Sequence, residues 1–375
     1  MSSSLQLVPV NEPLLNGNEE KYLSECIRTG WISSEGPFVK RFEEEMASRV
    51  GRRYGIAVSN GTAALDAAVD ALGIGYGDEV IMPTFTIISC IAQIVRAGAK
   101  PVLVDSDPST WNMDVNQIES KITPKTKAIM IVHIYGLPAD VDPVLELARR
   151  YGLKVIEDAA EMHGQTYKKR PCGSFGDISI FSFYPNKHVT TGEGGMLVTD
   201  DPVLAEVSQG LRNLCFQPAK RFVHERLGWN LRMTNLQAAI GVAQLERLDE
   251  FVIRKRRMGK RYTELLSGLP GVQLPLECTD AAENIYWVYG LVLDESKGID
   301  AERAMKLLAA KGIGCRPFFC PMHQQPVLRS MGLFEGESYP VADHLYKQGF
   351  YIPSGMALSE KQMTVVAEAV WEVLG

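Results

Sequence analysis

The chain has 375 residues, of which 46% are hydrophobic and 22% are charged, and its formal net charge at pH 7 is -6. A chain of this length and composition can bury a large core, as globular proteins do. Its negative charge disfavours nucleic acid and anionic membranes as partners.

The sequence also bears on the compartment and on metals. No uninterrupted apolar run is long enough to span a bilayer, and the start Met1-Ser-Ser-Ser lacks the basic and apolar regions of a signal peptide. The seven cysteines are scattered and include no Cys-x-x-Cys pair, so neither a disulfide framework nor a zinc site is indicated. We therefore expect a cytoplasmic protein without a bound metal.

The first 55 residues contain two helical patterns, at residues 17–28 and 39–50. A loop of small residues that carries Trp31, Ser33 and Ser34 separates them. Such loops usually pack as turns, and a loop that faces a ligand is the alternative.

From residue 54 onward, short apolar segments alternate with amphipathic helical patterns. The expected strands are residues 54–58, 79–83, 101–105, 127–133, 154–157, 178–183 and 196–199. The expected helices between and after them are residues 62–72, 88–97, 143–151 and 202–214. This alternation predicts an α/β fold with a mainly parallel sheet that is covered by helices on both faces.

An Ala-rich helix capped by Thr234 or Asn235 and a long helix at residues 248–266 lead into the last part of the chain. There we expect a strand at 287–293, a helix at 301–311, a strand at 314–319, an irregular segment and a C-terminal helix from Ser359. We predict a large α/β domain at residues 1–250, which includes the N-terminal segment, and a smaller α+β domain at residues 251–375.

Lys187 follows an apolar strand and a Pro-Asn turn, and a Thr/Gly-rich turn leads from it into the next strand. Most lysines in loops are solvated charges. A lysine held in an apolar wall instead has a lowered pKa and can act as a nucleophile or a general base. The local pattern alone leaves both interpretations open.

Two further features lie at strand ends. A strand that turns through Gly61 and Thr62 into a helix directs backbone N–H groups and the helix dipole toward one point, which suits a phosphate or merely caps the helix. Asp158 ends the strand at residues 154–157 and is suited to a helix cap, a metal ligand or a partner for a cationic ring nitrogen. The metal interpretation is weak, because no cluster with ligand spacing accompanies Asp158, and His163 fits a core or surface position.

These features match one cofactor, pyridoxal 5'-phosphate. It needs a lysine for a covalent bond, a carboxylate that keeps its ring nitrogen protonated, and donors for its phosphate. Lys187, Asp158, Ser182 and the Gly61-Thr62 turn supply these groups in a suitable order.

The sequence resembles the DegT-type family of pyridoxal-phosphate-dependent nucleotide-sugar aminotransferases, and within it the GDP-perosamine synthases. The resemblance extends over nearly the whole chain. The motifs that carry it are residues 30–34, 59–65, 77–81, 132–136, 156–161, 181–187, 191–196, 230–235 and 316–319. It implies a fold type I aminotransferase whose larger domain binds the cofactor.

The resemblance implies a role for each matching residue. Lys187 bonds to the cofactor and carries protons, Asp158 holds the ring nitrogen, and Glu161 lies near the ring oxygen. Ser182, Gly61 and Thr62 bind the phosphate, and Asn235 reaches the phosphate of a neighbouring subunit, which implies a homodimer with shared active sites. Ile87 occupies a position that is usually aromatic and stacks on the ring.

The resemblance also implies the reaction. L-glutamate gives its amino group to C4 of a nucleotide-linked 4-keto-6-deoxy sugar, with GDP-4-keto-6-deoxy-D-mannose as the favoured substrate and lipopolysaccharide O-antigen synthesis as the setting. Trp31, Ser33, Ser34, Arg232, Arg316 and His323 are the candidate substrate contacts, although packing and surface pairing explain them nearly as well.

Other functions stay open at this point. The alternatives are a 3- or 4-keto sugar linked to UDP or dTDP, a dehydration, and a silent cofactor-binding regulator. Dehydrating relatives carry histidine at the lysine position, so Lys187 favours transamination.

Overall fold

The computed structural model describes residues 7–217 and 219–375. Its largest feature is a seven-stranded sheet with the order β1-β9-β8-β5-β4-β2-β3. In this order the strands are β1 (Tyr54–Val58), β9 (Gly195–Thr199), β8 (Ile178–Ser182), β5 (Lys154–Asp158), β4 (Thr126–Val132), β2 (Glu79–Pro83) and β3 (Lys100–Val104). Strand β9 is antiparallel to both of its neighbours and the other pairs are parallel, which confirms the predicted mainly parallel sheet.

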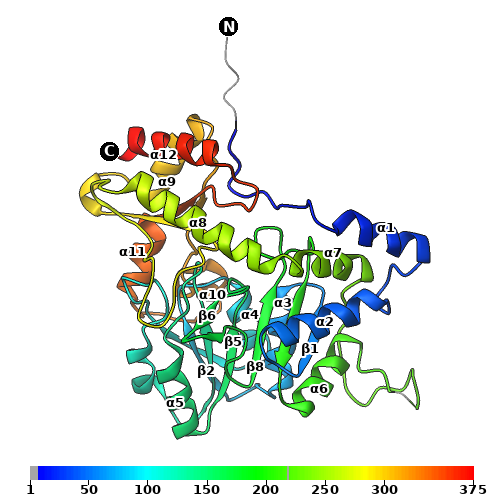
Figure 1. The fold of residues 1–375 in the computed structure, drawn as a ribbon. Coiled ribbons are helices and arrows are strands. Elements are labelled where there is room, and N and C mark those ends of the chain that lie inside the picture. The colour runs from blue at the N-terminus through cyan, green and yellow to red at the C-terminus, as the bar shows by residue number, and fades with distance from the viewer. Residues whose placement is uncertain (1–6, 218) are drawn as a thin grey trace.

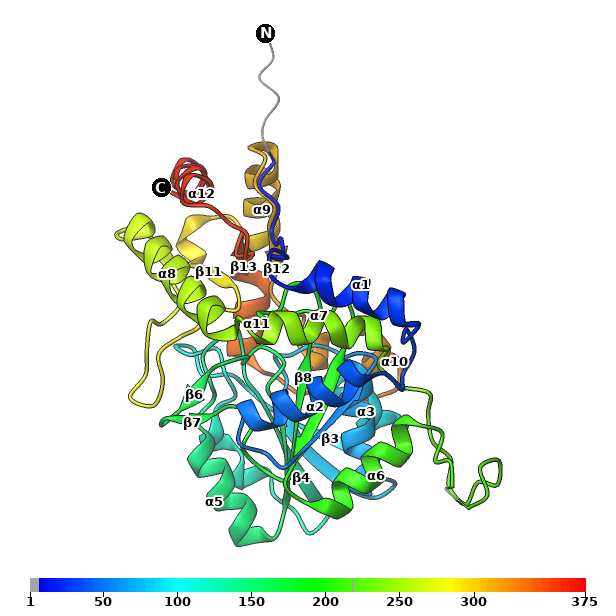
Figure 2. The same cartoon turned by 45° about the vertical axis from the view of Figure 1, so that its right-hand side comes forward.

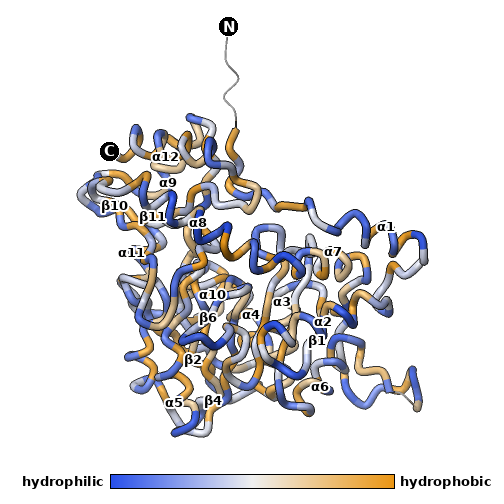
Figure 3. The backbone as a smooth tube through the Cα atoms, viewed as in Figure 1, coloured by the Kyte–Doolittle hydropathy of each residue, from blue (hydrophilic) through white to orange (hydrophobic). Residues whose placement is uncertain are grey.

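Alternation along the strands sends side chains to two separate cores. In β4, Ile129 and Ile131 join one core whereas Met130 and Val132 join the other. Both faces of the sheet are therefore covered, and the strands are apolar on both sides. Figure 3 shows hydrophobic segments along the strands in the interior.

Helices cover both faces (Figures 1 and 2). One core takes side chains from α1 (Glu19–Thr29), α2 (Pro37–Arg49), α5 (Val141–Tyr151) and α7 (Asn235–Leu245). The other takes side chains from α3 (Gly61–Ala71), α4 (Ser89–Arg96) and α6 (Pro202–Arg212). The three-layer α/β arrangement expected from the sequence is confirmed.

Helix α8 (Leu248–Leu266) has the predicted bounds and leads to a second, four-stranded antiparallel sheet (Figure 2). The sheet comprises, in spatial order, β10 (Val272–Gln273), β11 (Tyr289–Leu293), β13 (Gly349–Ile352) and β12 (Arg316–Pro317). Helices α8, α9 (Ala301–Ala310) and α12 (Glu360–Leu374) share a third core with this sheet.

The segment expected to be irregular is more ordered than predicted. It contains α10 (Pro326–Ser330), α11 (Pro340–Gln348) and β13, and the predicted strand at residues 314–319 shortens to β12. Strand β13 pairs with both β11 and β12. Its four residues form a strand because partner strands lie on both sides. The sequence of so short a segment does not reveal partners that are distant in the chain.

The N-terminal segment lies beside the second sheet. Val8 forms a bridge with Ile313, and the carbonyl groups of Val10 and Glu12 accept bonds from Ser354 and Ala357. Residues 8–12 were predicted to belong to the large domain. These bonds attach them to the C-terminal part of the chain, and Asn11 also donates a 3.0 Å hydrogen bond to the carbonyl of Pro185 beside the large sheet.

The remaining regular elements are short. They are the hairpin β6 (Thr166–Tyr167) and β7 (Arg170–Pro171) and the 3-10 turns η1 (Val115–Gln117), η2 (Glu119–Lys121), η3 (Glu295–Lys297) and η4 (Met322–Gln324). Within the described ranges, no helix has the length and apolar character needed to cross a membrane.

Candidate active site

A cavity of about 670 Å3 lies where β4, β5 and β8 reach their carboxyl ends. In a parallel sheet these ends meet at one edge, where ligands commonly bind. Residues from the second sheet region, including Trp287 and Tyr351, complete the wall. The cavity brings together these predicted cofactor residues: Gly61, Thr62, Ile87, Asp158, Glu161, Ser182 and Lys187.

Lys187 is held in the cavity wall. Its side chain is only 10% exposed, and its Nζ lies 3.6 Å from Oε1 of Glu161. Burial lowers the pKa of the Lys187 amine, and the carboxylates of Glu161 and Asp158 oppose that shift. The solvated-loop interpretation is therefore wrong, because Lys187 lies in the apolar wall.

A backbone hydrogen bond fixes the carboxylate of Glu161. Its Oε2 accepts a 2.7 Å hydrogen bond from the N–H of Tyr135, which is a left-handed residue with φ of 59°. Burial raises the pKa of Glu161 to about 7, while the Lys187 amine opposes the shift. Glu161 and Lys187 thus form a buried pair in which burial favours the neutral state of each partner.

Asp158 is the last residue of β5 and is also buried. Its Oδ1 accepts from the N–H of Ala160 at 3.0 Å, and its Oδ2 accepts from the Sγ of Cys90 at 3.2 Å. Burial raises the pKa of Asp158, and these two hydrogen bonds oppose the rise. The carboxylate is both anchored to its own turn and turned toward the cavity.

The first turn of α3 forms another part of the wall. The side chain of Asn60 caps the helix by accepting from the N–H of Ala63 at 2.8 Å. A Cβ on Gly61 would lie 2.7 Å from the Cβ of Ser182, so only glycine allows β8 to approach this closely. The hydroxyl of Thr62 lies 2.8 Å from that of Ser89. The N-terminal N–H groups and hydroxyls together suit a phosphate.

The residues present fit pyridoxal phosphate. The start of α3 with Ser182 supplies uncharged donors and a helix dipole for the phosphate. Asp158 supplies a buried carboxylate for the ring nitrogen, and Lys187 supplies the amine. Ile87 also lines the cavity and is 46% exposed, so an apolar side chain is available at the position predicted to cover the ring.

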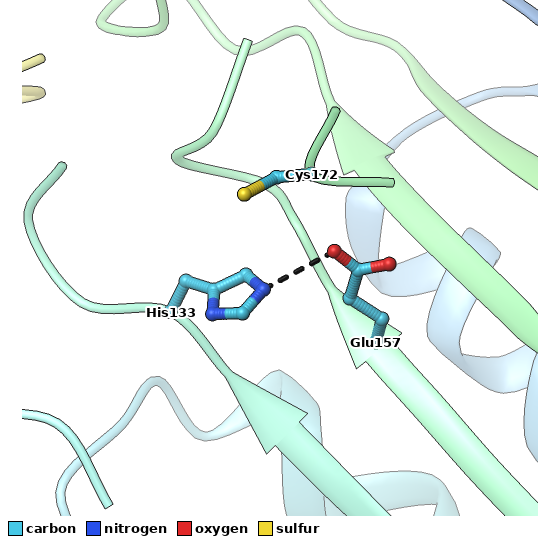
Figure 4. A group of neighbouring side chains, drawn as sticks. All are labelled: His133, Glu157 and Cys172. Atoms are coloured by element: carbon cyan, nitrogen blue, oxygen red, sulfur yellow. Dashed lines mark hydrogen bonds and ion pairs between the residues drawn. The ribbon is translucent and has the colours of Figure 1, made fainter. Parts of the chain in front are cut away.

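His133, which also lines the cavity, forms a buried group with Glu157 and Cys172. The potential metal ligand atoms of the group lie within 4.8 Å of one another (Figure 4). The donor set does not suit a cation. Glu157 accepts hydrogen bonds from Gly173, Phe175, Ser179 and His133.

Both ring nitrogens of His133 are also used in hydrogen bonds within the protein. Nδ1 of His133 accepts from the N–H of Ala139 at 3.1 Å, so the ring proton is on Nε2 and points to Glu157 at 3.2 Å. His133 and Glu157 therefore form a hydrogen-bonded support at the ends of β4 and β5.

Asn235 has a different role from the predicted one. It is fully buried, and its Nδ2 donates to the carbonyl of Trp31 at 2.7 Å while its Oδ1 accepts from the N–H of Phe38 at 2.8 Å. The side chain ties the loop before α2 to the start of α7. Reaching a phosphate in a second subunit would break these bonds, so the geometry argues against the predicted contact.

The predicted substrate contacts are dispersed. Ser34 and Arg232 line a separate cavity of about 300 Å3, and Trp31 is 50% exposed outside the main cavity. The carbonyl of Ser33 is bonded to the N–H of Asn235. Arg316 is exposed on β12, where it pairs with Tyr351 of the cavity wall.

His323 is a structural residue. Its ring nitrogens lie 2.9 Å from the hydroxyl of Thr84 and 2.8 Å from Oδ1 of Asp343. The ring is buried beside Tyr339, at 4.8 Å between centroids. The prediction that His323 contacts substrate is corrected, because both nitrogens are used within the fold.

Several residues of the site were missed. Cys90 bonds to Asp158, Tyr135 holds Glu161, and Trp287, Phe319 and Tyr351 line the cavity. Cys90 follows Ser89 at the start of α4. The sequence places α4 after a strand, but it gives no sign that the Cys90 side chain contacts Asp158 at the end of another strand. The aromatic residues come from the second sheet region, and no local pattern relates them to Lys187.

Comparisons with known proteins agree with this geometry. The model of the DegT/DnrJ/EryC1/StrS aminotransferase family matches residues 13–371. The chain is 42% identical to the GDP-perosamine synthase of Caulobacter vibrioides, with 99% of this chain and 100% of the relative covered. It is 42% identical to the GDP-perosamine synthase of Escherichia coli O157:H7, with 98% and 99% covered. The PLP form of Spr1654 from Streptococcus pneumoniae superposes with a TM-score of 0.90 at 25% identity, over 98% of both chains.

Proposed function

The chain belongs to the DegT/DnrJ/EryC1/StrS aminotransferase family, and from this premise we propose that it transfers an amino group from L-glutamate to C4 of GDP-4-keto-6-deoxy-D-mannose, giving GDP-perosamine. Members of the family are pyridoxal-phosphate-dependent sugar aminotransferases, so the chain is an enzyme of this class. The names of the two relatives from Caulobacter vibrioides and Escherichia coli O157:H7 support the choice of GDP sugar.

One observation carries the proposal: the buried Lys187 amine shares one cavity with Asp158 and with the start of α3. When bound, pyridoxal phosphate supplies an electron-accepting ring that stabilises the carbanion formed when a substrate loses a proton. The carboxylate of Asp158 holds the proton on the ring nitrogen. Gly61, Thr62 and Ser182 hold the phosphate.

Lys187 has two tasks in this proposal. Its lowered pKa leaves a larger fraction of the amine neutral, and a neutral amine can bond to the cofactor and accept a proton. Glu161, 3.6 Å away, keeps the amine on the side of the reacting atoms. The two side chains are only 10% and 8% exposed, so solvent screens their interaction little.

The diphosphate of the sugar nucleotide requires cations that this cavity lacks. Among the described residues that line it, Lys187 is the only lysine or arginine. We therefore propose that a second copy of the chain supplies cationic groups, with Arg232 as the leading candidate. Exposed apolar side chains that shortly precede Arg232 in the sequence, including Trp229 and Leu227, support an interface between copies.

Absorption spectroscopy of the cofactor-loaded protein tests the reaction. L-glutamate should remove the visible band of the lysine-bound cofactor, and GDP-4-keto-6-deoxy-D-mannose should restore it. UDP- and dTDP-linked 4-keto-6-deoxy sugars serve as controls. Recovery with another sugar would replace the proposed substrate, and a band that ignores glutamate would reject the proposed amino donor.

Mixing of two variants, assayed at a substrate concentration at which each alone turns over poorly, tests the shared site. If Arg232 acts across the interface, each site takes Lys187 from one subunit and Arg232 from the other. A dimer of Lys187→Ala with Arg232→Ala then contains one site with both residues intact and one site with neither. Random exchange of subunits should then restore about a quarter of the wild-type sites, as expected for a symmetric dimer. No recovery after confirmed exchange would place both residues in the same subunit or exclude Arg232 from the site.

A further inference from the structure

We propose that Trp287 is a positioning residue for Lys187: its indole face holds the Lys187 amine whenever that amine is not bonded to the cofactor, and its indole N–H fixes the backbone beside it. This inference rests on the proposed role of Lys187 but is independent of which sugar is the substrate.

The first support is the position of the amine. Nζ of Lys187 lies 3.8 Å from the centroid of the Trp287 ring. Trp287 is only 4% exposed, so little water competes for the contact. A cation over a tryptophan face is attracted by the electrons of the ring, and the attraction grows as water is removed.

The second support is a separate contact with the backbone. The indole Nε1 of Trp287 donates a 2.8 Å hydrogen bond to the carbonyl of Asn186, the residue that precedes Lys187. The Trp287 side chain therefore contacts both the amine of Lys187 and the backbone immediately before Lys187. A ring that only filled the core would need neither contact.

The third support is the anchorage of Trp287 itself. The buried amine of Lys255 donates a 2.8 Å hydrogen bond to the carbonyl of Trp287 and another to the carbonyl of Ser354. Lys255 lies on α8, which connects the two sheet regions. The ring of Trp287 also packs against Tyr135, at 5.8 Å between centroids. Trp287 is therefore fixed by the C-terminal part of the chain and reaches the amine of the large sheet region.

Other titratable groups also face the Lys187 amine, and all of them stay unchanged in the variants proposed here. They are Glu161, Asp158 and Cys90, which favour the charged amine, and His163 and His188, whose own pKa values fall partly because of Lys187. A change produced at residue 287 is thus measured against a constant background.

The test measures capture of pyridoxal phosphate by the apoprotein as a function of pH, from the growth of its visible band. Only the neutral amine reacts, so the midpoint of the pH profile reports the pKa of Lys187. The Lys187→Ala variant corrects for other lysines. Trp111→Phe is the matched control, because Trp111 is a buried tryptophan outside this cavity and its Nε1 has no partner in the described residues.

Trp287→Leu removes the ring that stabilises the charged amine, so the midpoint should move to lower pH by roughly one unit. Trp287→Phe keeps a ring face and should shift the midpoint less. It loses the bond to Asn186, and its plateau capture rate should fall by about fivefold, the effect of one hydrogen bond. Trp111→Phe should change neither value.

The proposal is overturned if folded Trp287→Leu keeps the wild-type midpoint. Should Trp287→Leu not fold, Trp287→Phe decides, and behaviour equal to Trp111→Phe in both midpoint and plateau rate rejects the proposal. Failure of the wild-type apoprotein to form the band would instead count against the cofactor role of Lys187. The two failures are therefore distinguishable.

Discussion

The cofactor end of the cavity and the predicted substrate contacts differ in how the fold supplies their residues. At the cofactor end, Asp158 and Ser182 end neighbouring strands, and Gly61 begins the helix packed beside them. Among the predicted substrate contacts, Arg232 lines a separate cavity and Arg316 lies on an exposed edge strand. Sheet topology assembles the cofactor residues, whereas the predicted substrate contacts lie in loops and on exposed surfaces.

This difference indicates that one copy of the chain forms the cofactor end of the site by itself. Parallel strands bring their ends together regardless of loop sequence, so a chain can build the cofactor end alone. Loops are free to vary and to contact a second copy. We expect changes at the cofactor end to alter chemistry, and changes at Arg232 or Arg316 to alter substrate affinity or assembly.

The largest effect is expected for Lys187→Ala. Loss of both the nucleophile and the proton carrier should lower kcat at least about a thousandfold. The visible band of the lysine-bound cofactor should also be absent. Lys168→Ala, which removes an exposed partner of Asp142, is the control and should leave kcat unchanged. Multiple turnover by Lys187→Ala would contradict the assignment.

Asp158→Asn should give the next largest effect. The amide cannot hold a proton on the ring nitrogen as the carboxylate does, so kcat should fall roughly a hundredfold, as when one preorganised electrostatic partner is removed. Binding of the cofactor should persist, because the phosphate donors are intact. Steady-state kinetics and cofactor titration check both expectations, and an unchanged kcat would remove Asp158 from the chemistry.

A pair of variants separates the two regions directly. Ser182→Ala should weaken cofactor binding about tenfold, since it removes one hydrogen bond to a charged group. His323→Ala should leave cofactor affinity unchanged and lower the free energy of unfolding by about 1 to 3 kcal/mol, because Asp343 and Thr84 lose a buried partner. Cofactor titration and denaturant unfolding distinguish the outcomes, and a weakened substrate affinity in His323→Ala with normal stability would reverse our correction.

The smallest effect is expected for Ile87→Phe. An aromatic face beside the ring should add roughly 0.5 to 1.5 kcal/mol to cofactor binding, which is about two- to tenfold in affinity. Ile87→Leu is the control, since it keeps an aliphatic side chain of the same volume. Equal affinities of the phenylalanine and leucine variants would show that position 87 does not cover the ring.

The sequence predicted well wherever the signal was local and periodic. Helix α8 begins and ends where its amphipathic pattern does, and Thr234 caps α7 through a capping box with Gln237. β13 was missed because its identity depends on β11 and β12, which pair with it from distant parts of the chain.

By itself, the sequence determined the α/β class, the approximate strands of the large sheet and the positions of Lys187, Asp158 and the Gly61-Thr62 turn, because each follows from hydrophobic periodicity and local turn chemistry. Only the tertiary structure decided that Asn235 and His323 are used inside the fold and that Trp287 lies over Lys187. A side chain's role depends on which partners reach it, and those partners are distant in the chain. Packing, rather than local pattern, therefore separates the residues that act from those that support them.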